Sequence, residues 1–187
     1  MKDLTLKIVL SATFISLGLA LPFLTGNIPY FGNMLCPMHI PIIIAGFVLG
    51  PWYGLGIGLV TPILRSFLFG MPPFYPSALC MSFELATYGL VSGLLYNLLS
   101  KTSLKHIVVI FISLVAAQLI GRGIWGVSRM ICGLFPNTKF TWQMFLSGGF
   151  KTAWPGIILQ LVLIPPLVIM VNRRLSYRMD NKNSVAA

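Results

Sequence analysis

Four ionisable residues interrupt long apolar segments of this sequence. Arg65 lies within the run VTPILRSFLFG, Glu84 lies in the next apolar segment, and Arg122 and Arg129 lie in a later one. A charge at the centre of a bilayer costs at least about 3 kcal/mol on insertion scales, so such groups normally face protein or a wet cavity and are paired. The four residues therefore predict a polar cavity inside a hydrophobic protein.

Spacing places other polar and aromatic residues on the same helix face as two of these charges. Gln118, Arg122, Trp125 and Arg129 fall at i, i+4, i+7 and i+11, which is one face of a helix. This pattern predicts that one segment directs an amide, two guanidinium groups and an indole toward the same neighbours.

Two other segments offer similar groups. Glu84 and Tyr88 form an i, i+4 pair, while Lys151, Trp154 and Gln160 can point inward from nearby levels of the last apolar segment. A mostly apolar pocket with a few convergent polar groups is the usual design of a small-molecule site. We therefore interpret these residues as candidates for ligand binding.

A purely structural interpretation stands beside the binding one. Arg65, near a span end, can extend its charge to the interface, and Glu84 can serve as the partner of one arginine. Trp125 and Trp154 also suit an interfacial aromatic belt. His39, between "CPM" and "IP", has no metal-ligand partner at useful spacing, so it is either a loop hydrogen-bonder or a ligand contact.

Templates for catalysis and metal binding are absent from the sequence. It contains no HExxH, GxSxG or GxxxxGK[ST] motif and no pair of intramembrane aspartates. A membrane-embedded enzyme would have to use Glu84 and His39 as a lone acid-base pair. Cys36, Cys80 and Cys132 fit no CxxC or zinc spacing, so we interpret them as packing residues rather than as a disulfide or metal ligands.

Composition determines which elements must position these residues. The chain has 187 residues, of which 57% are hydrophobic and 9% charged, with a mean hydropathy of +0.89. This balance lies outside the range of soluble domains and predicts an all-α integral membrane protein, a single domain over residues 1–187. The predicted transmembrane helices are residues 5–22, 38–50, 53–69, 77–99, 104–134 and 146–171.

The second and fifth of these segments depart from an ordinary span. Residues 38–50 are too few to cross a bilayer with ease, and Pro41 and Gly46 weaken their helix, so this segment is expected to lean on its neighbours. Residues 104–134 are long enough to be tilted or broken.

Basic residues predict the orientation. The formal net charge is +10, which in a soluble protein would suggest nucleic acid, but here the cations gather in the N-terminus, the 100–105 loop and the C-terminal tail. Six spans put these three segments on one side, and the positive-inside rule makes that side cytoplasmic, so both termini are predicted inside. A signal peptide over residues 1–22 is the alternative, but its removal would leave five spans and spoil this asymmetry.

The predicted outer connections are the long ones. Residues 22–41, 70–77 and 135–144 are rich in proline and aromatic residues, and such stiff loops lose less entropy when they cover a ligand. An outward-facing site is therefore predicted, to which the first two loops add Asn33 and Tyr75.

A strip of small residues marks the first span. Ala12, Ser16 and Ala20 repeat at four-residue spacing, which leaves a flat surface for close packing of another helix. The strip serves either packing within the chain or contact with a partner.

Together, these features resemble the substrate-binding S components of energy-coupling factor (ECF) vitamin transporters. The segment MHIPIIIAGFVLGPWYGLGIGLVTPILRSFLFGMPPFYPSALCMSFELATYGLVSGLLY, residues 38–96, is similar to the central stretch of that superfamily. The resemblance covers most of the chain and is strongest over residues 33–96.

The resemblance implies a six-helix S-component fold, with a vitamin held near the outer face by loops one, three and five and by spans four to six. It implies a membrane coupling subunit and two cytoplasmic ATPases as partners, in a prokaryotic cell membrane. It implies no catalysis by this chain and no cofactor, since the vitamin is the transported ligand. In the family the span-one strip contacts the coupling subunit; here Ser16 replaces the usual alanine and remains small. The loaded S component then tips over in the membrane to deliver its ligand inward.

The balance of embedded charge suggests the class of vitamin. Arg65, Arg122 and Arg129 against Glu84 leave an excess of two positive charges, which an anionic ligand would relieve. Pantothenate, a small carboxylate with hydroxyl and amide groups, is the first choice, with Arg122 or Arg65 pairing its carboxylate and Glu84 and His39 binding its hydroxyls.

A vitamin B6 form is the second choice. Trp125, Tyr88 or Trp154 would stack on its ring, and Glu84 would face its nitrogen or amine. Folate and the thiamine pyrimidine also stay open.

Overall fold

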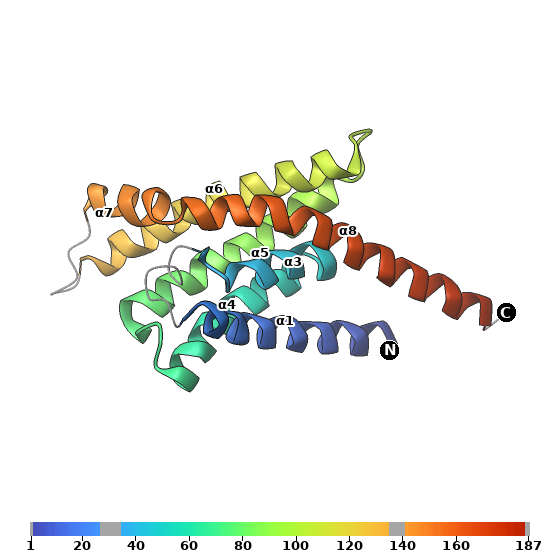
Figure 1. Cartoon of the computed structure of the whole chain (residues 1–187), viewed down its shortest axis with the longest axis horizontal. Helices are drawn as coiled ribbons and strands as arrows, with labels where there is room; N and C mark the ends of the chain where they lie inside the picture. The colour runs from blue at the N-terminus through green and yellow to red at the C-terminus, as the bar shows by residue number, and fades with distance from the viewer. Residues whose placement is uncertain (1, 27–34, 135–140, 186–187) are drawn as a thin grey trace.

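The computed structural model of this chain describes residues 2–26, 35–134 and 141–185. Within these ranges all regular secondary structure is helical, and the helices run roughly along one long axis (Figure 1). Five of the described helices are long and apolar enough to cross a membrane. The all-α membrane fold predicted from composition is therefore confirmed.

The long helices follow the predicted spans closely in the first two thirds of the chain. They are α1 (Lys2–Gly26), α4 (Pro51–Phe69), α5 (Leu79–Leu99), α6 (His106–Cys132) and α8 (Trp154–Val185). A π-helical turn, η1 (Phe74–Ala78), leads into α5. Gly70 ends α4 in the left-handed conformation, with φ of 67°, which glycine adopts without strain.

The second predicted span is α3 (His39–Leu49), a buried helix of 11 residues. Its length is about 16 Å, well short of the hydrocarbon core of a bilayer, so it cannot cross alone. It contacts α1, α4, α5 and α8, and Ile42, Ile43 and Ala45 are fully buried. A helix that is apolar all round belongs in such a central position.

The last predicted span needs a correction to its boundaries. Instead of one helix over residues 146–171, α7 (Trp142–Leu146) is followed by a π-helical turn, η2 (Ser147–Lys151), and α8 begins only at Trp154. Gly148 and Gly149 explain the interruption, because glycine is a poor helix former. At its other end α8 continues past residue 171, beyond the helical bundle (Figure 1).

Helices α4 and α5 approach each other closely through glycine. A Cβ on Gly54 would lie 2.5 Å from the Gly89 carbonyl oxygen, and one on Gly89 would meet the Gly54 backbone. Both residues thus allow backbone-to-backbone packing that any side chain would prevent. This contact holds α5, which carries Glu84, against the rest of the bundle.

Both termini and the 100–105 loop lie at the same end of the molecule (Figure 1). The three basic segments therefore gather at one end of the helices, as predicted for six membrane-inserted segments. Which side of the membrane this end occupies stays a prediction from the positive-inside rule.

Candidate functional site

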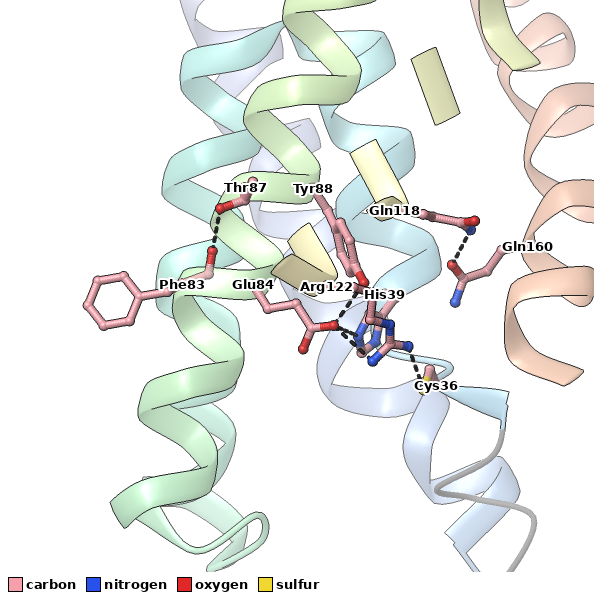
Figure 2. Close-up of polar contacts among 9 residues, drawn as sticks. All are labelled: Cys36, His39, Phe83, Glu84, Thr87, Tyr88, Gln118, Arg122 and Gln160. Atoms are coloured by element: carbon pink, nitrogen blue, oxygen red, sulfur yellow. Dashed lines mark hydrogen bonds and ion pairs between the residues drawn. The ribbon is translucent and has the colours of Figure 1, made fainter. Parts of the chain in front are cut away.

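Glu84 is the centre of a buried polar cluster. Its side chain projects from the second turn of α5, and the residue is 1% exposed. The Tyr88 hydroxyl donates to its Oε1 at 2.8 Å, and Arg122 Nη1 lies 3.0 Å from the same oxygen. His39 Nε2 lies 3.7 Å away, and Figure 2 shows all three side chains converging on one carboxylate oxygen.

Each partner reaches Glu84 from a defined place in the fold. Tyr88 is one helical turn later on α5, Arg122 comes from α6, and His39 is the first residue of α3. Gly121 gives the tyrosine its room, because a Cβ there would meet the Tyr88 ring. The i, i+4 pair predicted from the sequence is thus formed.

Arg122 is the arginine that pairs with Glu84. Both side chains are buried, with exposed fractions of 8% for the arginine and 2% for the glutamate. Arg122 Nη2 also lies 3.9 Å from Cys36 Sγ, in the turn that precedes α3. Cys36 has a φ of 45°, and its carbonyl accepts a hydrogen bond from His39 N at 3.0 Å, so this turn places both residues against the cluster.

Arg65 has a different environment. Its Nη1 donates to the Leu19 carbonyl of α1 at 2.6 Å, and its guanidinium carbon lies 4.9 Å from the Phe23 ring centroid and 5.7 Å from that of Phe69. The residue is 9% exposed, and among the described side chains no carboxylate pairs with it. A dipole and two ring faces therefore stabilise a charge that remains formally uncompensated.

The Glu84 cluster and Arg65 both border one cavity, which has a volume of about 670 Å³. Its wall is formed by the end of α1, the turn before α3, the loop that follows α4, and parts of α5, α6 and η2. Five of the predicted binding residues line it: His39, Arg65, Glu84, Arg122 and Trp125. The volume lies within the range of about 300–1,000 Å³ typical of small-molecule sites.

The family described as ECF transporter, substrate-specific component matches residues 6–168. The chain belongs to this family. No curated protein and no solved structure matches it significantly. This S component is thus a membrane-embedded, substrate-binding transport subunit and not an enzyme, as the sequence resemblance implied.

Trp125 connects the cavity of the S component to an aromatic stack. Its ring lies 6.2 Å from that of Phe145, and Phe145 lies 5.1 Å from Trp142, both pairs nearly parallel. Gly126 admits the Phe145 ring, and a Cβ on Gly148 would lie 3.2 Å from Trp125. Trp125 is therefore fixed at the cavity edge by α7 and η2.

Other predicted binding residues lie near the cavity without lining it. Tyr88 is behind Glu84, and Gln118 donates to Gln160 Oε1 at 2.9 Å, a buried contact between α6 and α8. Tyr75 donates to the Cys132 carbonyl at 3.0 Å and so joins η1 to the end of α6.

A last group of predicted binding residues is not brought to the cavity wall. Arg129 is half-buried two turns beyond Arg122, and Lys151 and Trp154 are exposed, the latter to 56%. Asn33 lies outside the described residues. A role of these residues in binding stays a prediction.

Cys36 is a cavity residue that the sequence interpretation does not include among the binding residues. The cysteine spacing predicts a packing role for it, yet it lines the cavity beside Arg122. Burial raises the pKa of its thiol, so the group is protonated at neutral pH. Its position three residues before His39, in a proline-flanked loop, was the available signal.

The small-residue strip of α1 faces away from the bundle. Ala12, Ser16 and Ala20 are all exposed, whereas Phe14 and Gly18 on the opposite face are buried against the other helices. The strip is therefore accessible to another helix in the membrane.

Proposed function

We propose that this S component binds a small carboxylate vitamin, with pantothenate as the first choice, for uptake by an ECF importer. The single observation that carries this proposal is Arg65, a buried cation at the cavity wall with no acidic partner among the described side chains. A ligand carboxylate would supply the missing negative charge.

The balance of charge around the cavity favours a ligand with one negatively charged group. Arg122 and Glu84 offset each other at 3.0 Å, so their pair is formally neutral, whereas Arg65 is not offset. The Leu19 carbonyl occupies one of its five guanidinium donors, and a planar fork suits a carboxylate bidentately. Arg65 is therefore the better candidate for the carboxylate than Arg122, the other arginine considered from the sequence.

The environment of His39 favours a ligand that also carries hydroxyl or amide groups. Its two ring nitrogens are buried without a hydrogen-bond partner among the described residues, and the side chain lines the cavity. Buried polar atoms are nearly always hydrogen-bonded in proteins, so a ligand group is a natural partner. Pantothenate offers two hydroxyls and an amide for this purpose.

A vitamin B6 form is the second candidate, and Trp125 is the observation that favours it. The indole lines the cavity and is stacked near Phe145, as a support for an aromatic ligand would be. Glu84 would then face the ring nitrogen or amine.

The proposed partners follow from the family. ECF transporters combine the S component with a membrane coupling subunit and two ATPases, and the exposed strip of Ala12, Ser16 and Ala20 suits contact with the coupling subunit. We place the cavity on the outer side and the basic end in the cytoplasm of a prokaryotic cell.

Ligand binding to the purified S component tests the proposal. Pantothenate should bind, and pantothenol, in which an alcohol replaces the carboxylate, should bind at least 30-fold more weakly, since losing one partner of a buried charge pair costs about 2–5 kcal/mol. Arg65→Met should weaken pantothenate binding similarly, whereas Arg65→Lys should retain part of it. Lys101→Gln, which removes an exposed cation in the 100–105 loop, outside the cavity lining, should change affinity less than two-fold.

Two results would reject these assignments. Equal binding of pantothenate and pantothenol would exclude a carboxylate site at Arg65. If neither pantothenate nor pyridoxal or pyridoxamine binds below roughly millimolar concentration, both ligand choices are wrong, and mass spectrometry of ligand retained through purification would then identify the class.

A further inference from the structure

A second hollow lies on α8, away from the vitamin cavity. It has a volume of about 340 Å³ and is lined by Pro166, Ile169, Met170, Arg173 and Arg174. These five residues fall at i, i+3, i+4, i+7 and i+8, so the hollow is a groove along one helix face. None of them belongs to the predicted vitamin site.

The groove is amphiphilic along its length. Its first half is apolar, and its two guanidinium groups follow about 10 Å further along the helix, at 1.5 Å per residue. Pro166, inside α8, forms the apolar end of the groove. An apolar groove that ends in two cations matches the shape of a lipid with a negatively charged headgroup.

The two arginines lie where a headgroup would be. The apolar stretch of α8 ends at Val171, and Arg173 and Arg174 follow it within three residues. At the same level, Asn172 Nδ2 donates to the Tyr96 hydroxyl at 3.2 Å, and that hydroxyl lies 2.8 Å from His106 Nε2. Tyr96 and His106 flank the 100–105 loop, so this contact places the groove at the basic end of the molecule.

The arginines have no acidic partner among the described side chains. Both are exposed, and the ion pairs of the described residues involve Glu84 alone. Asn172, which is partly buried, faces Tyr96, whereas the adjacent arginines are exposed. Two neighbouring cations at a membrane surface attract anionic lipid, with about 1 kcal/mol for each Lys or Arg.

We propose that this groove binds an anionic phospholipid of the surrounding membrane. The phosphate contacts Arg173 and Arg174, and an acyl chain lies along Met170, Ile169 and Pro166. An acidic segment of a partner protein would complement the two charges but would leave the apolar half of the groove, within the membrane-length segment, without an occupant. This proposal is independent of the vitamin and of the importer partners.

Lipid titration of the purified full-length chain tests the proposal. Native mass spectrometry in a neutral detergent would compare phosphatidylglycerol with phosphatidylcholine of the same acyl chains. Phosphatidylglycerol should bind more tightly to the wild type, and the Arg173→Ala/Arg174→Ala variant should lose about 30-fold in its affinity, or about five-fold for each arginine. Phosphatidylcholine binding should change less than two-fold.

Two controls distinguish lipid binding in the groove from general attraction to positive charge and from binding of the phosphate group alone. Lys101→Ala/Lys105→Ala removes the same charge at the same end but outside the groove, and should leave phosphatidylglycerol affinity within two-fold. Glycerophosphoglycerol, the headgroup without chains, should show no detectable binding.

The proposal is overturned if the two lipids bind equally, if the lysine variant loses as much affinity as the arginine variant, or if the free headgroup binds as well as the lipid. Thermal unfolding of each variant checks that its fold is intact. Should the alanine variant not fold, Arg173→Gln/Arg174→Gln keeps the polarity and length of the side chains and has the same expected loss.

Discussion

The buried pair of Glu84 and Arg122 predicts that removing one partner destabilises the protein more than removing both. In Arg122→Leu, a carboxylate that is 2% exposed loses the cation at 3.0 Å. Breaking a buried ion pair typically costs about 3–5 kcal/mol. Tyr88 still donates to the carboxylate at 2.8 Å, so a value of about 3 kcal/mol is expected at pH 7.

Protonation sets an upper limit on this penalty. Neutralising a carboxyl group costs about 1.4 kcal/mol for each pH unit above about 4.3, which is about 4 kcal/mol at pH 7 and about 1 kcal/mol at pH 5. The destabilisation by Arg122→Leu should therefore shrink to about 1 kcal/mol or less at pH 5.

Unfolding in detergent by a graded denaturant, at pH 7 and pH 5, measures these differences. The variants are Arg122→Leu, Glu84→Gln and the double variant, which should lie within about 1.5 kcal/mol of the wild type at pH 7 because no charge is left unpaired. Arg122→Leu should also abolish vitamin binding while the protein still inserts into the membrane.

Additive losses of stability in the three variants would contradict a coupled Glu84–Arg122 pair. If the double variant loses the sum of the two single losses, the residues do not act as a pair. If Arg122→Leu is as stable as the wild type at pH 7, Glu84 is not held as an ion by Arg122.

Two further predictions use the same unfolding measurement. Gly89→Ala should cost about 1–3 kcal/mol because its Cβ would meet the Gly54 backbone, whereas Gly123→Ala, with nothing within 4 Å, should cost nothing; equal losses would contradict the close approach. Gln118→Leu should cost about 1–3 kcal/mol because it leaves the Gln160 amide buried and unpaired, while Leu at both positions should restore most of that loss; a double variant less stable than the single one would exclude this.

Hydrophobic patterning predicted the helices because a bilayer sets their length and composition. It also placed Glu84 next to Tyr88, since a spacing of four within one unbroken helix fixes a common face. The same spacing argument was less informative for Lys151 and Trp154. Helical phase is not continuous between them, because η2 ends at Lys151 and α8 begins at Trp154.

Contacts between segments far apart in the chain could not be predicted from the sequence. Arg65 is 46 residues from Leu19, whose backbone carbonyl accepts its hydrogen bond. A carbonyl acceptor has no sequence signature, because every residue carries one. The positive φ of Cys36, which turns the chain into α3, is equally invisible in the sequence, since that conformation is uncommon for any residue but glycine.

The excess of positive charge at the cavity wall is smaller in the structure than the sequence predicts. From the sequence alone, three embedded arginines stand against one glutamate, an excess of two positive charges. In the structure Arg122 is offset by Glu84, and Arg129 is not among the described residues that line the cavity, so the uncompensated charge at the wall is that of Arg65 alone. An excess of one favours a monoanion such as a carboxylate. A phosphorylated vitamin would bring nearly two negative charges to a single guanidinium and, by burying the surplus, would bind less well than its unphosphorylated form.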